Sequence, residues 1–154
     1  MKINPEEREL KARAYFKEGY NCTQSVVMAF ADVLGLDESR AAILASGFGG
    51  GMGRLREVCG AFSGAVLLSG TISVKDPSDR IQRKDNYALV QKFADSFSRN
   101  FGSIVCRDLL QKRSQEREGP SPSERNEGWY ASRPCENLVG FCAAMVARHI
   151  LEAE

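Results

Sequence analysis

The spacing of apolar residues along the chain predicts helices almost throughout. Pro5 and an acidic first turn begin a run of helix-forming residues that Gly19 ends. A second helix is predicted over 21–35, where Val26 and Phe30 belong to one apolar face and the first residues have the spacing of a capping box. These segments contain no convincing alternation of apolar and polar residues, so strands are not expected.

Three more helices are expected in the middle of the chain. One covers 38–46 after a capping aspartate, and another begins at Asp76 and Pro77 and continues to about residue 99. Between them, 58–72 ("VCGAFSGAVLLSGTI") is apolar on nearly all sides, and a buried strand is the alternative there. Gly60 and Gly64 lie four residues apart, which predicts a flat face where another helix or a ligand comes close.

The last third combines a long polar stretch with two helices. Ser103 opens a short helical segment, and 114–134 ("SQEREGPSPSERNEGWYASRP") follows as a loop longer than most connections in compact domains. This loop is either a mobile lid or is held in place by Trp129 and Tyr130. The final helix, over 135–154, completes an all-α fold. We expect residues 1–154 to form a single compact bundle of six to seven helices with a glycine-rich loop and one long polar loop.

Charge and the absence of apolar runs narrow the function classes. The 154 residues carry 21 basic and 20 acidic side chains, which gives a net charge of +1. This balance gives no electrostatic reason to expect nucleic acid or anionic lipid as the main partner. The first twenty residues are too charged for a signal peptide, and no run approaches the roughly 20 apolar residues of a membrane span. We therefore expect a cytoplasmic protein without membrane insertion, in which thiols stay reduced.

Five cysteines in such a compartment indicate metal binding or redox chemistry more than structural disulfides. Cys22, Cys59, Cys106 and Cys135 are far apart and form no CxxC pair, but each falls at a predicted helix start. Unpaired N–H groups and the helix dipole should stabilise a thiolate there and lower its pKa. Cys142 lies two turns inside the last helix, where packing is the favoured role.

Two chemistries are open for the four cysteines at helix starts. They could bind a metal or an iron–sulfur cluster, and His149 is the only histidine, so the site would be mostly thiolate and would suit zinc or iron–sulfur. This interpretation is slightly favoured, because four ligands match the coordination demand. Alternatively, two of them could cycle between dithiol and disulfide. Any enzymatic role would then be that of a thiol-based or iron–sulfur oxidoreductase with an unknown redox partner.

The glycine-rich loop before Cys59 ("GFGGGMGR") suggests a second function class. Successive N–H groups could form a nest for a small anion, with Arg54 adding charge; the glycines proposed for it are Gly49, Gly50, Gly51 and Gly53. In this hypothesis the protein is an anionic-ligand binding module and its cysteines are structural. The loop could instead let the backbone approach sulfur, or be a flexible turn. A third hypothesis is a helical interaction protein, a homodimer joined through its small-residue helix.

Four stretches together resemble the C_GCAxxG_C_C family of redox-active proteins: "NCTQSV", "GGGMGRLREVCGAFSGAVLLSG", "FGSIVCRDLL" and "RPCENLV". The family is defined by four cysteines, and its CGAxxG motif is matched in full from Cys59 to Gly64. The resemblance covers roughly residues 15–150 and maps the other cysteines onto Cys22, Cys106 and Cys135. It implies a redox role. A related domain occurs in the split-Soret type of cytochrome with an iron–sulfur cluster, but this chain has no CxxCH haem attachment site.

Overall fold

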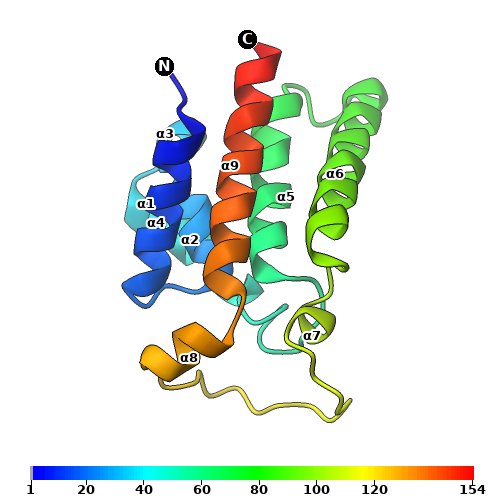
Figure 1. The fold of residues 1–154 in the computed structure, drawn as a ribbon. Coiled ribbons are helices and arrows are strands. Elements are labelled where there is room, and N and C mark those ends of the chain that lie inside the picture. Colours follow the sequence, from blue (N-terminus) through cyan, green and yellow to red (C-terminus); the bar gives the residue numbers. More distant parts are fainter. Residues whose placement is uncertain (1) are drawn as a thin grey trace.

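The computed structural model describes residues 2–154 and contains only helices and loops over that range. Helices α5 (Gly60–Ser73) and α9 (Cys135–Ala153) lie side by side at the centre, as Figure 1 shows. On one side they contact α1 (Pro5–Lys17) and α2 (Cys22–Met28), and on the other side α6 (Arg80–Phe101) packs against α5. The all-α prediction is therefore confirmed.

Local sequence signals explain where several helices begin and end. The Asn4 carboxamide accepts hydrogen bonds from the N–H groups of Glu6 and Glu7, and Pro5 occupies the first turn of α1. The capping box at the start of α2 is present, with Asn21 and Gln24 bonding reciprocally. These helix starts are confirmed.

The helix predicted over 21–35 is wrong as a single element. It divides into α2 and a short α3 (Ala31–Leu34), because the chain tightens at Phe30, whose N–H bonds to the carbonyl of Val27. The Ala29 carbonyl freed by this break accepts a hydrogen bond of 2.7 Å from the Arg8 guanidinium, which also pairs with Asp32. Arg8, which is distant in sequence, therefore stabilises this break in the helix. The local sequence contains no glycine or proline that would predict the break.

The long helix also begins later than predicted. Asp76 bonds to Ser78 in a local turn, whereas Asp79 caps α6 by accepting from the N–H groups of Ile81 and Gln82. The remaining elements are α4 (Glu38–Ala45), the 3-10 turn η1 (Ser46–Phe48), α7 (Cys106–Leu109) and α8 (Glu127–Ser132). Residues 2–154 thus form six helices of at least seven residues, together with three short ones.

The core lies where α5 meets its neighbours. Segment 58–72 is largely helix, and the strand alternative is wrong. Gly60 and Gly64 face α2. A Cβ added to Gly60 would lie 2.8 Å from the Thr23 hydroxyl, and one added to Gly64 would lie 2.9 Å from the Cβ of Val26. The prediction of a flat face that another helix approaches is therefore confirmed. Phe97 of α6 joins the same core through Phe62. Between residues 2 and 154, no helix is both long and apolar enough to cross a membrane.

Candidate functional site

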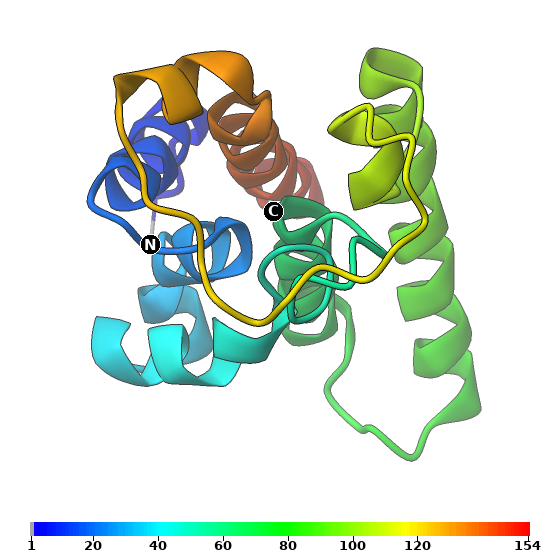
Figure 2. The same cartoon turned by 90° about the horizontal axis from the view of Figure 1, so that it is seen from below.

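Four helix beginnings gather at the end of the bundle opposite the chain termini (Figure 1). Cys22, Cys106 and Cys135 are the first residues of α2, α7 and α9, and Cys59 is the residue before α5. The placement of these cysteines at helix starts is therefore confirmed. All four line one cavity of about 360 Å³. The polar segment between α7 and α8 runs across this end of the bundle (Figure 2).

A short antiparallel pairing brings Cys59 and Cys106 to the same wall of the cavity. Val58 bridges Val105, the Cys59 N–H donates to the carbonyl of Ile104 at 2.8 Å, and the Cys106 N–H donates to that of Glu57 at 2.6 Å. These bonds fix the start of α5 against the start of α7. Two cysteines distant in sequence thereby become neighbours in the fold.

The glycine-rich loop forms a left-handed turn. All five residues from Gly50 to Arg54 have φ between +53° and +70°. Each residue with a side chain pays about 1–2 kcal/mol in this conformation, whereas glycine does not. The density of glycine just before Cys59 therefore reflects the handedness of the turn.

Two glycines also admit the cysteine-bearing helices. A Cβ on Gly51 would lie 2.7 Å from the Cβ of Cys106, and one on Gly60 would lie 3.2 Å from the Cβ of Cys22. Both distances are shorter than comfortable van der Waals contact. In the loop, Gly51 therefore lets the backbone approach the Cβ of Cys106, which is close to the alternative in which the loop approaches sulfur.

The predicted anion nest is wrong for the second half of the loop. The N–H groups of Gly53 and Arg54 donate to the carbonyls of Gly47 and Gly49, so they are not available to an anion. Gly49 packs on the side chain of Asn21. These N–H groups bond to carbonyls of the same loop, because a left-handed turn of this length closes internal hydrogen bonds.

The Arg54 side chain is held by the polar segment. Its guanidinium pairs with Glu118 at 3.2 Å and bonds to the Gly119 carbonyl and the Ser123 hydroxyl. The same Glu118 carboxylate makes two bonds to Arg56, at 2.6 and 3.0 Å. These cations hold the pKa of Glu118 down at about 2, Arg56 having the largest effect.

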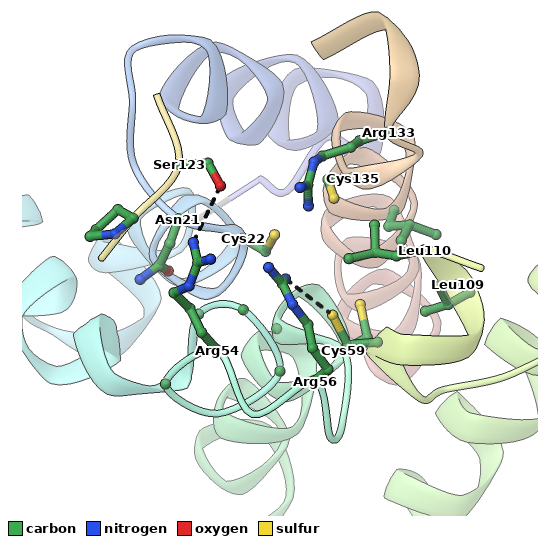
Figure 3. A pocket seen from close by; sticks show the side chains of 18 of the residues that line it. Asn21, Cys22, Arg54, Arg56, Cys59, Leu109, Leu110, Ser123, Arg133 and Cys135 are labelled. Atoms are coloured by element: carbon green, nitrogen blue, oxygen red, sulfur yellow. Dashed lines mark hydrogen bonds between the residues drawn. The ribbon is translucent and has the colours of Figure 1, made fainter. Parts of the chain in front are cut away.

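Cys22 and Cys135 both line the cavity, and their pKa values depend on each other. The hydrogen bond from the Cys22 thiol is the main cause that lowers the pKa of Cys135 to about 7. Arg133 and Arg56 add to this effect, and Figure 3 shows guanidinium groups approaching the two sulfurs from different sides. The same hydrogen bond, together with burial, raises the pKa of Cys22 well above its ordinary value.

Burial dominates at the other two cysteines. A lowered pKa was expected at all four helix starts, but only Cys135 has one, and the expectation is wrong for the other three. Desolvation raises the pKa of Cys59 to about 12, although the N–H groups of Ala61 and Phe62 act in the opposite direction. Desolvation also raises the pKa of Cys106, against the hydrogen bond that Arg56 donates to its sulfur at 3.7 Å. Helix N-termini stabilise thiolates, but less than the loss of water destabilises them here.

Two arginines of the cavity have aromatic partners. Arg125 lies over the rings of Phe16 and Trp129, with its guanidinium carbon 4.6 and 4.7 Å from their centroids, and it donates to the Phe16 carbonyl. Arg133 lies over the Trp129 ring at 4.8 Å. Sequence reasoning missed both arginines. Only Arg133, two residues before Cys135, offered a signal.

The remaining candidates lie away from the cavity. Cys142 is fully buried in the core among apolar side chains, where burial raises its pKa, and its predicted packing role is confirmed. His149 stacks edge-on against Phe93 near the other end of α9, and the cavity lining does not include it. Among the described residues, the lining of the cysteine cavity therefore contains no histidine.

The donor set of the cavity suits a thiophilic metal, but its geometry does not. Four sulfurs line one cavity. Between residues 2 and 154, however, no group of three or more cysteine, histidine, aspartate or glutamate side chains is arranged to hold a metal ion. A four-thiolate centre would require the cysteine side chains to move together.

Comparison with known proteins identifies the family. Residues 20–149 match the family described as "Putative redox-active protein (C_GCAxxG_C_C)", and this range contains all four cysteines of the cavity. No curated protein and no solved structure matches the chain. Because the match covers most of its length, the protein belongs to the C_GCAxxG_C_C family.

Proposed function

We propose that the protein is a dithiol–disulfide redox protein whose exchanging pair is Cys22 and Cys135. This proposal is carried by the position of the two thiols on one cavity that arginines also line, together with the mutual dependence of their pKa values. Disulfide exchange needs two thiols within reach, one of them with a lowered pKa. The linked pKa values of the pair and the lowered pKa of Cys135 support both conditions.

The environments of the two thiols assign their roles. Cys135 begins a helix of 19 residues and is close to the positive charge of Arg133, so a thiolate forms there near neutral pH. Cys22 keeps its proton, because burial and the neighbouring thiolate both raise its pKa. Cys135 is therefore the attacking thiolate, and Cys22 is the thiol that resolves the mixed disulfide.

The reaction balances as a two-electron exchange. The Cys135 thiolate forms a bond to one sulfur of a substrate disulfide, whose S–S bond breaks to release one thiolate. Cys22 then attacks the Cys135 sulfur, and the second product leaves with the proton of Cys22. The protein ends with a Cys22–Cys135 disulfide, and the substrate ends as two reduced thiols.

A second candidate is a four-thiolate zinc or iron–sulfur centre built from the same cysteines. It is favoured by the presence of all four sulfurs around one cavity. The centre would bind through Cys22, Cys59, Cys106 and Cys135 and, as a cluster, would supply one-electron transfer. It requires a rearrangement that the dithiol mechanism does not.

One anaerobic preparation tests both candidates. Metal analysis and a visible spectrum should detect less than one metal ion per chain, and stoichiometric iron with a coloured cluster would favour the second candidate instead. Thiol titration before and after a mild disulfide oxidant should show the loss of two thiols. Mass spectrometry of the peptides should then join Cys22 to Cys135.

Single-cysteine variants complete the test. Cys135→Ser should keep the same thiol count before and after the oxidant, because the attacking thiolate is gone. Cys142→Ala removes one thiol outside the cavity and is the matched control, which should still lose two. A disulfide between any other cysteines, or an unchanged count in the wild type, would refute the pair.

A further inference from the structure

The lining of the cysteine cavity is strongly cationic. It includes four arginines, Arg54, Arg56, Arg125 and Arg133, and contains no aspartate or glutamate. A cavity with cationic walls concentrates anions, because the field is screened less inside a cavity than at an open surface. The four positive charges of these arginines are more than one cysteine thiolate would neutralise.

The acidic partners of these arginines are few. Arg54, Arg56 and Lys112 share the single carboxylate of Glu118. Arg125 and Arg133 pack on aromatic rings, and among residues 2–154 neither forms an ion pair with an acidic side chain. Several positive charges around the sulfurs are therefore uncompensated within the protein.

The size and shape of the cavity indicate a small ligand. Its volume of about 360 Å³ lies at the lower end of the range for small-molecule sites. Apolar side chains such as Leu109, Leu110 and Leu138 form part of the wall. Guanidinium groups match the planar geometry of carboxylates, as the two-bond contact between Arg56 and Glu118 already illustrates.

We propose that the substrate is a small disulfide that carries carboxylate groups. This inference rests on the proposed dithiol function and names the oxidant that the pair reduces. One carboxylate pairs with Arg133 or Arg54, so that the substrate S–S bond lies beside the Cys135 sulfur, between guanidinium groups that Figure 3 shows around Cys22 and Cys135. The two products are carboxylate-bearing thiols, formed by the exchange already described.

Matched disulfides of different charge test this substrate class. The reduced protein is mixed with 3,3′-dithiodipropionate, which is dianionic, or with bis(2-hydroxyethyl) disulfide, which is neutral and of similar size. Mass spectrometry then follows the rate at which the Cys22–Cys135 disulfide forms. The ratio of the two rates, divided by the same ratio for free 2-mercaptoethanol, removes the intrinsic reactivity of each compound.

Charge variants locate the origin of the preference. We expect the normalised ratio to be about tenfold in the wild type, and to fall several-fold in Arg133→Gln and in Arg54→Gln. The ratio cancels any change in the reactivity of Cys135 itself. Arg148→Gln removes the same charge from an exposed position near the other end of α9 and should leave the ratio unchanged.

The outcomes separate the substrate class from the function. If both disulfides oxidise the pair with a normalised ratio near one, the substrate class is wrong and the dithiol function stands. A high ratio that neither arginine variant lowers would also overturn the substrate class. If neither compound produces a Cys22–Cys135 disulfide, the dithiol function itself fails.

Discussion

The left-handed turn before Cys59 makes a quantitative prediction about two of its glycines. In Gly51→Ala the new methyl group would lie 2.7 Å from the Cβ of Cys106, 2.8 Å from the Glu57 nitrogen and 2.9 Å from the Arg56 Cα. Two of these atoms are backbone. They are held in place because the Glu57 N–H donates to the Gly51 carbonyl at 2.8 Å.

Gly53→Ala is the matched control. Gly53 has φ of +53°, so alanine pays a similar conformational cost of about 1 kcal/mol there. The nearest atom to its new methyl group would be the Gly47 oxygen at 3.9 Å, which is an ordinary contact. The difference between the two variants therefore measures the close approach alone.

We expect Gly51→Ala to lose about 1–3 kcal/mol more of the free energy of unfolding than Gly53→Ala, the usual cost of forcing an extra methyl into packed structure. Equilibrium urea unfolding checks this value. With a slope of about 2 kcal/mol per molar urea, the midpoints should differ by about 0.5–1.5 M. Equal losses in the two variants would refute the contact with Cys106, and no loss in either would refute the left-handed turn.

Three further predictions concern the site and its supports. Alkylation of Cys135 by iodoacetamide should accelerate as the pH rises and reach half its maximum near pH 7, since its pKa is lowered to about 7; a midpoint at the ordinary value for a thiol would contradict this. Glu118→Gln should cost about 1–2 kcal/mol of unfolding free energy at neutral pH. That loss should fade between the ordinary carboxyl pKa of 4.5 and about 2, because Arg56 holds the pKa of Glu118 down and acid removes the benefit; a loss independent of pH would contradict it. Thr23→Val should cost about 1–2 kcal/mol by urea unfolding, because it removes the buried 2.8 Å bond from this hydroxyl to the carbonyl of Gly60, and unchanged stability would contradict that role.

Local patterns in the sequence were sufficient to predict most helices and to predict which four cysteines lie at helix starts. Capping residues and apolar spacing acted within a few residues, so the starts of α1, α2 and α9 were predictable. The break at Phe30 was not, because it depends on Arg8 of another helix, which bonds to the carbonyl of Ala29. The start of α6 was predicted wrongly, because the sequence does not show which of Asp76 and Asp79 accepts the capping hydrogen bonds.

What the sequence by itself determined is that four cysteines stand at helix beginnings, because helix starts are set by short-range hydrogen bonding. Only the tertiary structure decided which of them influence each other most and that the pKa of Cys135 is the one lowered. Packing removes water from Cys59 and Cys106, and it brings Cys22 and Arg56 to Cys135, where Arg133 is already close in sequence. A thiol pKa depends on water and charge within a few ångströms, and most of the neighbours that supply them come from parts of the chain that are distant in sequence.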